Sequence, residues 1–168
     1  MFKKSRLFLI LALLLSLTLL FGACQPAPEP APVEEEVFKL GLLGPFSGPS
    51  AQTGKQFKGG ATIAMEDVDY KIGHYTIEPV WIDSQSDPAK ASQAYEQAVV
   101  QDDIQAGALN WHSSVAVAVM EVTAKHEVPH IFGFGATEKV NETFESDPEK
   151  YGYWSTKGWP TPGKLGNK

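Results

Sequence analysis

The sequence has 168 residues, of which 20 are acidic and 14 basic. This negative balance disfavours nucleic acid as a partner, and no basic cluster occurs after residue 6. The single cysteine, Cys24, excludes an internal disulfide bond, and residues 37–168 have the size of one domain rather than two.

Three cationic residues, Lys3, Lys4 and Arg6, precede an uncharged apolar run over residues 7–21. A membrane-spanning helix needs about 20 apolar residues, so this run is too short to be one. A cationic start, a short apolar run and small residues before a cleavage point are typical of a secretory signal. We therefore expect residues 1–23 to be a signal peptide that is removed on export.

The apolar run ends in the segment Phe21-Gly22-Ala23-Cys24, which resembles a bacterial lipobox. The resemblance implies a lipoprotein signal peptide, after which Cys24 becomes the acylated first residue and anchors the exported protein to a membrane. An ordinary signal peptide with a chance cysteine is the alternative. Proline and glutamate dominate residues 24–36, so this segment is predicted to be an extended, solvated tether.

The folded part begins with an apolar run over residues 37–43, which stops at Gly44-Pro45 and is predicted to be a buried strand. A loop rich in glycine and proline follows. Residues 55–68 are predicted to form a helix. Its apolar stripe consists of Phe57, Ala61, Ala64, Met65 and Val68. Residues 75–82 alternate in polarity and favour a second strand.

A second helix is predicted to start at Asp87-Pro88, where an aspartate cap meets a proline in the first turn. Residues 107–111 favour a short third strand, and residues 115–125 a buried helix capped by Ser113-Ser114. The valines of this helix also suit a strand, but length and the serine caps favour the helix. Two more strands are predicted, over residues 128–134 and within residues 151–156.

Strands that alternate with helices imply an α/β fold with a doubly wound parallel sheet, covered by helices on both faces. Ligands of such sheets bind outside the carboxyl ends of the strands. The loops at those ends are therefore the candidate binding segments: residues 44–54, 83–87, 111–114 and 133–140.

The string His126-Glu127-Val128-Pro129-His130 has the spacing of a zinc-protease helix, in which two histidines share one face and the glutamate is the base. Pro129 removes a backbone donor and pushes Val128 out of the helical conformation. The two histidines then do not share one regular helical face. We interpret the string as a helix end, a turn and a strand start without a metal, and a zinc site is the alternative.

Two glycine-rich segments resemble nucleotide-binding motifs but depart from them. Residues 48–55 are one residue longer than a phosphate loop, and Gln56 replaces the hydroxyl that binds magnesium. Gly133-Phe134-Gly135 is half of a dinucleotide fingerprint, with Glu138 at the third glycine position. No nucleophile, base and orienting group assemble, so the sequence predicts a protein that is not an enzyme and has no cofactor.

Hydroxyl groups at two strand ends form a candidate binding site. Ser113 and Ser114 start a helix, where hydroxyls, free N–H groups and the helix dipole favour an anion. Gly135-Ala136-Thr137 follows the next strand, and its small residues let the backbone approach a ligand. Plain helix capping and an ordinary turn are the alternatives, and both stay open.

The residues that have been described resemble, in order and spacing, the leucine/isoleucine/valine-binding protein family across residues 37 to about 159. The segments that carry the resemblance are Leu40 to Pro49 (LGLLGPFSGP), Asp83 to Pro88 (DSQSDP), the Ser113-Ser114 step and Gly135-Ala136-Thr137. The resemblance implies a type I periplasmic binding protein, in which two α/β lobes close on a ligand. Two lobes each need a domain's length of chain, so we expect residues 37–168 to be the first lobe, incomplete.

In this family the serine pair holds the carboxylate of an amino acid through a hydroxyl and an N–H group, which implies this role for Ser114 with Ser113 beside it. The family's turn gives a carbonyl and a hydroxyl to the ammonium group and an amide to the carboxylate. These roles fall on Gly135, Ala136 and Thr137.

A first-loop residue covers the ligand with an aromatic ring in some members, and Thr53 occupies this position here. The resemblance therefore does not single out leucine. It implies three partners: an amino acid or similar ligand, the permease of an ABC transporter and, through the lipid anchor, a membrane. A sensor of the same fold for amides or small organic acids is the second functional interpretation, and a secreted zinc hydrolase is the third.

Overall fold

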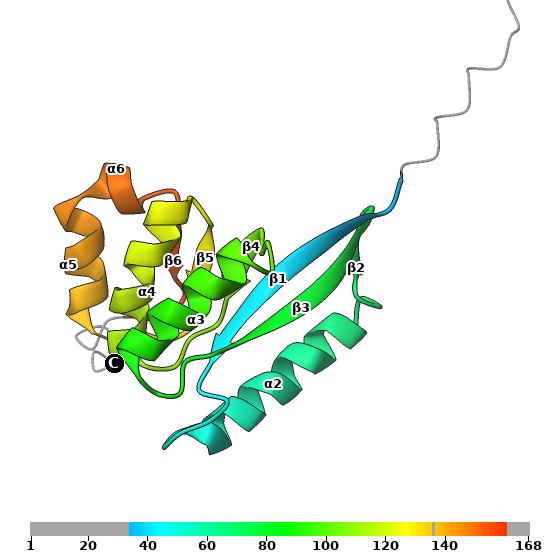
Figure 1. Cartoon of the computed structure of the whole chain (residues 1–168), viewed down its shortest axis with the longest axis horizontal. Coiled ribbons are helices and arrows are strands. Elements are labelled where there is room, and N and C mark those ends of the chain that lie inside the picture. Colours follow the sequence, from blue (N-terminus) through cyan, green and yellow to red (C-terminus); the bar gives the residue numbers. More distant parts are fainter. Residues whose placement is uncertain (1–33, 136, 161–168) are drawn as a thin grey trace, which may run out of the picture. The chain divides into compact units, whose positions relative to one another are not determined.

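The computed structural model describes residues 34–135 and 137–160 (Figure 1). The predicted signal peptide, Cys24, most of the tether and Ala136 lie outside the described residues. The described elements, in chain order, are β1 (Glu36–Gly44), α2 (Ala51–Glu66), β2 (Lys71–Ile72), β3 (Tyr75–Asp83), α3 (Pro88–Val100), β4 (Ala106–Ala108), α4 (Ser113–His126), β5 (His130–Phe132), α5 (Glu138–Ser146), α6 (Pro148–Tyr151) and β6 (Ser155–Lys157).

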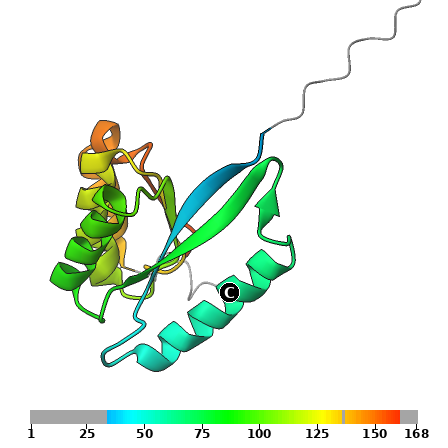
Figure 2. The ribbon, with the colours of Figure 1, turned by 45° about the vertical axis from the view of Figure 1, so that its right-hand side comes forward.

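A single six-stranded sheet runs in the order β2-β3-β1-β4-β5-β6. Only the short β2 is antiparallel to its neighbour, and the other pairings are parallel. The chain moves from β1 to β3 on one side and then to β4 on the other, so the strand order reverses at β1. The predicted doubly wound α/β fold is confirmed, and its crossover helices lie on both faces of the sheet (Figure 2).

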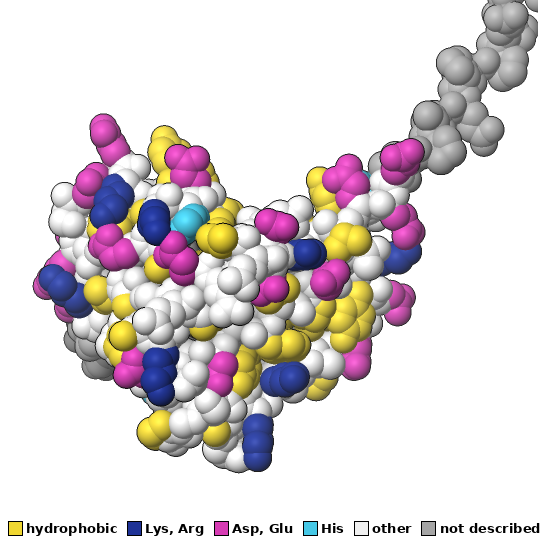
Figure 3. Space-filling view, in the orientation of Figure 1, with side chains coloured by type: hydrophobic (Ala, Val, Ile, Leu, Met, Phe, Trp, Pro, Cys, Tyr) yellow, Lys and Arg dark blue, Asp and Glu magenta, His cyan; other side chains and the backbone are white. Residues whose placement is uncertain are grey.

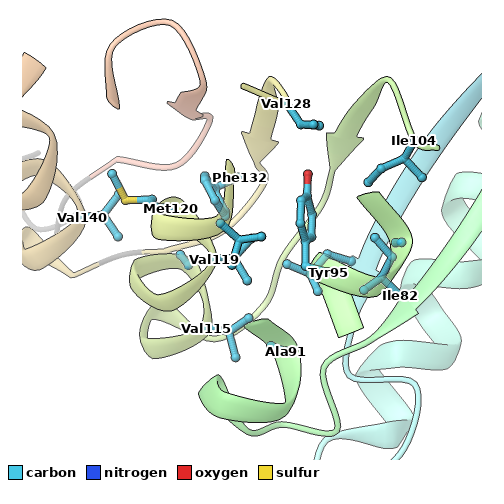
Figure 4. Close-up of a cluster of buried hydrophobic side chains, with 14 of the residues drawn as sticks. Ile82, Ala91, Tyr95, Ile104, Val115, Val119, Met120, Val128, Phe132 and Val140 are labelled. Atoms are coloured by element: carbon cyan, nitrogen blue, oxygen red, sulfur yellow. The ribbon is translucent and has the colours of Figure 1, made fainter. Parts of the chain in front are cut away.

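One face of the sheet carries most of the core. Helices α3 and α4 pack on it, and side chains from both helices, the strands and α5 form one buried cluster. Figure 4 shows Tyr95 of α3, Val119 of α4 and Phe132 of β5 within this cluster. Its buried members are Leu43, Ile82, Ala91, Tyr95, Ala98, Ile104, Val115, Ala116, Val119, Met120, Val122, Val128, Phe132, Val140 and Tyr151. We call this side the α3/α4 face.

The opposite side, which we call the α2 face, has a smaller core. Its buried members are Leu42, Met65 and Ile77, because α2 is the only helix among residues 34–135 and 137–160 that covers it. Ile131 of β5 is 58% exposed and Ile63 of α2 is 59% exposed. Figure 3 shows hydrophobic side chains at the surface over β1, β3 and α2, interspersed with acidic and basic ones.

Helix α2 differs from the helix predicted over residues 55–68, because it begins at Ala51 and ends at Glu66. Gly54, expected in the loop, lies inside the first turn, where a Cβ would stand 2.2 Å from the carbonyl oxygen of Pro45. The glycine thus permits close packing of the helix on the chain. The predicted stripe is confirmed in part, since Met65 is buried and Phe57 and Ala61 are half-buried, whereas Ala64 and Val68 are exposed.

Helix α4 is confirmed as a buried helix despite its valines, but its start is not the predicted one. His112 is the N-cap residue, and no side chain caps the helix by a hydrogen bond. Ser113 and Ser114 are the first two helical residues, so the prediction that they cap α4 is wrong. Their hydroxyls are consequently not used by the cap.

Several short elements were displaced or missed. Strands β4 and β5 have three residues each, shorter than predicted, because Leu109 and Asn110 have positive φ angles and Gly133 follows Phe132 directly. β6 runs over residues 155–157 rather than within 151–156. The two-residue β2 and the helices α5 and α6 were not predicted, and α5 has only Val140 buried to give it an apolar pattern. No described helix is long and apolar enough to cross a membrane.

Candidate functional site

The first two candidate loops are held together at the carboxyl edge of the sheet by Asp83, the last residue of β3. Its carboxylate accepts hydrogen bonds from the Ser47 amide at 3.0 Å, the Ser47 hydroxyl at 2.5 Å and the Gln85 amide at 2.9 Å. Partial burial raises the pKa of Asp83, but these hydrogen bonds outweigh it and hold the pKa below its usual value. Asp83 therefore fixes the loop after β1 as an ionised anchor.

The third and fourth loops meet at a shallow hollow between the N-termini of α4 and α5. Ser113, Ser114, Val117, Thr137 and Lys139 line it, and its volume is about 470 Å³. We call it the serine–threonine hollow. It joins three of the predicted site residues, although they come from two loops that are separated by a helix and a strand. The positive ends of two helix dipoles and a lysine ammonium make it suitable for an anion.

The fourth loop contributes Gly135 and Thr137. Gly135 is buried and has a φ angle of 138°, which is accessible to glycine and unfavourable for other residues. Thr137 is the N-cap of α5, and its hydroxyl oxygen accepts a hydrogen bond from the Lys139 amide at 3.2 Å. A threonine hydroxyl retains a proton and a second lone pair for a ligand. Ala136 between them lies outside the described residues.

Thr53 is half-buried in the first turn of α2 and does not line the serine–threonine hollow. A neighbouring residue links this turn to the third loop, because the Ser50 hydroxyl lies 3.0 Å from His112 Nε2. Partial burial lowers the pKa of His112, which favours the neutral ring. The structure thus connects the start of α2 to the start of α4 without placing Thr53 beside the serines.

Aromatic rings from three of the same segments pack together near this edge. Trp111 lies edge-on to Phe57 of α2 at 6.0 Å between ring centroids and to Phe134 at 5.1 Å. Phe57 stacks on Phe134 at 5.7 Å, and Phe134 also contacts Trp159 at 4.4 Å. The four rings form an aromatic cluster beside the loops that carry the candidate site, and Trp111 is partly exposed.

The His126–His130 string forms a helix end, a turn and a strand start, as predicted. His126 ends α4, Glu127 has a left-handed conformation and His130 is the first residue of β5. His126 Nε2 lies 2.8 Å from a carboxylate oxygen of Glu96, whereas His130 is buried against Tyr95. Across the described residues, no three side chains of metal-ligating type come together as a metal site would require.

Two residues of this edge were missed in the sequence. Lys139 lines the serine–threonine hollow, and Asn110 is buried between the third and fourth loops. Lys139 lacked a signal because α5 itself was not predicted. Asn110 had one, since asparagine tolerates the unusual backbone angles that end a strand.

A protein-family model described as periplasmic binding protein matches residues 37–159. The Leu/Ile/Val-binding protein homolog 6 of Brucella abortus is 35% identical over 106 residues, which are 62% of this chain and 27% of that protein. The matched region therefore spans about a quarter of the relative's length.

Solved structures show the same fold. A solute-binding protein of an ABC transporter from R. palustris, in complex with 4-hydroxybenzoate, superimposes with a TM-score of 0.64 and 25% identity, over 75% of this chain and 32% of that chain. The branched-chain amino acid transporter substrate-binding protein LivJ from Streptococcus pneumoniae, in complex with isoleucine, has a TM-score of 0.65 and 22% identity, over 75% of this chain and 34% of that one.

Proposed function

Since the chain belongs to the periplasmic binding protein family, we propose that it acts as the extracytoplasmic solute-binding component of an ABC importer. It binds a small ligand and delivers it to a permease, without chemical conversion of the ligand. The observation that carries the proposal is the serine–threonine hollow, in which Ser113, Ser114 and Thr137 converge at the carboxyl edge of a parallel sheet.

The proposed ligand is a branched-chain or related amino acid. Its carboxylate lies at the start of α4, where backbone N–H groups and the hydroxyls of Ser113 and Ser114 receive it, and Thr137 contacts the same end of the ligand. Gly135 and Ala136 offer backbone groups beside it. Thr53, in the first turn of α2, is proposed to cover the ligand.

A small aromatic or other organic acid is the second candidate ligand. The observation that favours it is the aromatic cluster of Phe57, Trp111 and Phe134, in which Trp111 comes two residues before Ser113, because rings stack well on rings. Lys139 supports the same choice, since its ammonium group, which lies 3.6 Å from an exposed carboxylate of Glu142, attracts an anion and repels the ammonium of an amino acid. The relative from R. palustris, solved with 4-hydroxybenzoate, is consistent with this class.

Titration calorimetry of the purified chain tests the proposal. The panel contains leucine, isoleucine, valine, glutamate and 4-hydroxybenzoate. A hydrogen bond to a charged group contributes about 1.5–3 kcal/mol, so Ser114→Ala and Thr137→Ala are each expected to weaken the preferred ligand roughly ten- to hundredfold. Ser92→Ala, on α3, is the matched control and should leave affinity unchanged.

Absence of binding to the whole panel would count against this function, and an unchanged affinity in both variants would leave the hydroxyls without a binding role. Zinc-dependent hydrolysis by the purified chain would contradict the proposal directly.

We further propose that the protein is exported through the signal in residues 1–23 and held at a membrane by acylated Cys24. Cys24→Ser should move the protein from the membrane fraction to the soluble fraction, as measured by fractionation and immunoblotting. If the variant remained in the membrane with its signal uncleaved, export could still hold but the lipid anchor would be refuted.

A further inference from the structure

The short connection between β4 and α4 has an unusual backbone for its residues. Leu109 has a φ angle of 72° and Asn110 one of 154°, and neither is glycine. Such angles cost conformational energy for a residue with a side chain, so other contacts must hold them. Two buried side chains supply these contacts.

The first contact is the His130 ring, which fixes Leu109. His130 Nε2 lies 2.8 Å from the Leu109 carbonyl oxygen, and Nδ1 lies 2.9 Å from the Tyr95 hydroxyl. A carbonyl only accepts, so Nε2 carries the proton and Nδ1 accepts from Tyr95. Burial lowers the pKa of His130 to about 4, which keeps this neutral form at physiological pH.

The second contact is the Asn110 side chain, which joins two loops. Asn110 is 1% exposed. Its Nδ2 donates to the carbonyl oxygen of His112 at 3.1 Å and to that of Phe134 at 3.0 Å. The Phe134 amide donates in turn to the Asn110 carbonyl oxygen at 3.2 Å. Asn110 thus connects the loop that ends at Ser113 to the loop that leads into Gly135.

The Asn110 side chain is not the one that would give the folded chain the greatest stability at this position. Its Oδ1 is buried and has no hydrogen-bond partner among the described residues. A buried acceptor without a partner costs free energy, and an apolar side chain of similar volume would avoid that cost. The two donated bonds, by contrast, need an NH₂ group at this point.

We propose that Asn110 is a positioning residue, which sets the distance between the Ser113-Ser114 and Thr137 sides of the serine–threonine hollow through its bonds to His112 and Phe134. The proposal rests on the function proposed above and adds a residue that does not itself touch the ligand. Without these bonds the two loops are coupled less tightly, and the hydroxyl groups of the serine–threonine hollow lose their fixed spacing.

Amide hydrogen exchange by NMR tests the positioning role without a ligand. Asn110→Gly suits the backbone angle and removes the buried side chain together with its bonds, and Asn110→Leu keeps the branched shape without a polar atom. In both, the amides of Phe134 and Ala116, which bond to the carbonyls of residues 110 and 112, should exchange at least about tenfold faster. Amides in α3 should keep their rates. Asp103→Gly, at an exposed turn with a φ angle of 55°, is the matched control.

The binding arm measures isoleucine and 4-hydroxybenzoate by calorimetry. The variants should lose about tenfold or more in affinity for whichever of the two the wild type binds. If the wild type binds neither, the proposed function fails but the exchange result still decides the loop connection. Unchanged exchange at Phe134 and Ala116, equal acceleration of all amides, or failure of both variants to fold would each overturn the positioning role.

Discussion

The two faces of the sheet differ in the size of the buried apolar core that packs against them. Adjacent residues of β1 show this, since Leu43 enters the cluster of the α3/α4 face and Leu42 the three-residue core of the α2 face. β5 repeats the pattern, with Phe132 buried and Ile131 exposed. Stability should therefore reside on the α3/α4 face, whereas the carboxyl edge between the faces carries the candidate site.

The largest expected effect is the loss of a core ring on the α3/α4 face. Phe132 of β5 is fully buried in the cluster of the α3/α4 face. Phe132→Ala should lower the free energy of unfolding by about 3–5 kcal/mol, because the lost contacts leave a cavity. Denaturant unfolding followed by circular dichroism measures this change. A loss below about 1 kcal/mol would show that this face is not the main core.

The second effect is acid sensitivity from His130 on the same face. Burial lowers the pKa of His130 to about 4, so as pH falls the unfolded chain takes up the proton first. The stability is present above the unfolded pKa of about 6.5 and is lost by about 1.4 kcal/mol per pH unit down to pH 4, about 3 kcal/mol in total.

Unfolding free energies measured at several pH values should show this slope. His130→Asn should remove most of it, although the lowered pKa of His112 contributes a smaller slope of the same sign. His74→Asn, in the turn before β3, is the matched control. A slope that is unchanged in the His130 variant would contradict the assignment.

The third prediction compares two glycines and expects opposite signs. A Cβ at Gly107 of β4 would lie 2.1 Å from His130 Nδ1 and 2.2 Å from the Tyr95 hydroxyl. Gly107→Ala should therefore destabilise by about 1–3 kcal/mol. Gly60 in α2 has no atom within 4 Å of such a Cβ, and Gly60→Ala should stabilise by about 0.5–1 kcal/mol through helix propensity. Thermal unfolding of both variants decides the signs.

The contrast between the faces also explains what could be predicted. Strand β1, strand β3 and helix α3 followed the sequence closely, because apolar runs and the Asp87 cap are local signals; the Asp87 carboxylate accepts from the Lys90 amide at 2.9 Å. The apolar stripe of α2 was only partly right, with Ala64 and Val68 exposed, because periodicity shows which residues share a side, and not how much sheet lies beneath them.

The candidate site could be predicted only in part for a related reason. Ser113, Ser114 and Thr137 could be proposed as candidates because hydroxyls at strand ends are visible in the sequence, and the structure places them on one hollow. Lys139 and Asn110 depend on contacts across the fold, between residues more than twenty positions apart in the case of Asn110 and Phe134. Their positions beside the site could be recognised only once the order of the strands in the sheet was known.

The smallest effect belongs to the α2 face. Ile131 is 58% exposed, so its side chain already lies largely in water, and threonine keeps the β-branched shape that strands favour. Ile131→Thr should change the free energy of unfolding by no more than about 0.5 kcal/mol. Val119→Thr is the matched control on the α3/α4 face, where a buried hydroxyl should cost about 1–3 kcal/mol. Denaturant titrations of both at two protein concentrations separate the outcomes. If Ile131→Thr cost as much as the control, the α2 face would be covered in solution, and a loss that grew with protein concentration would identify a second copy of the chain as the cover.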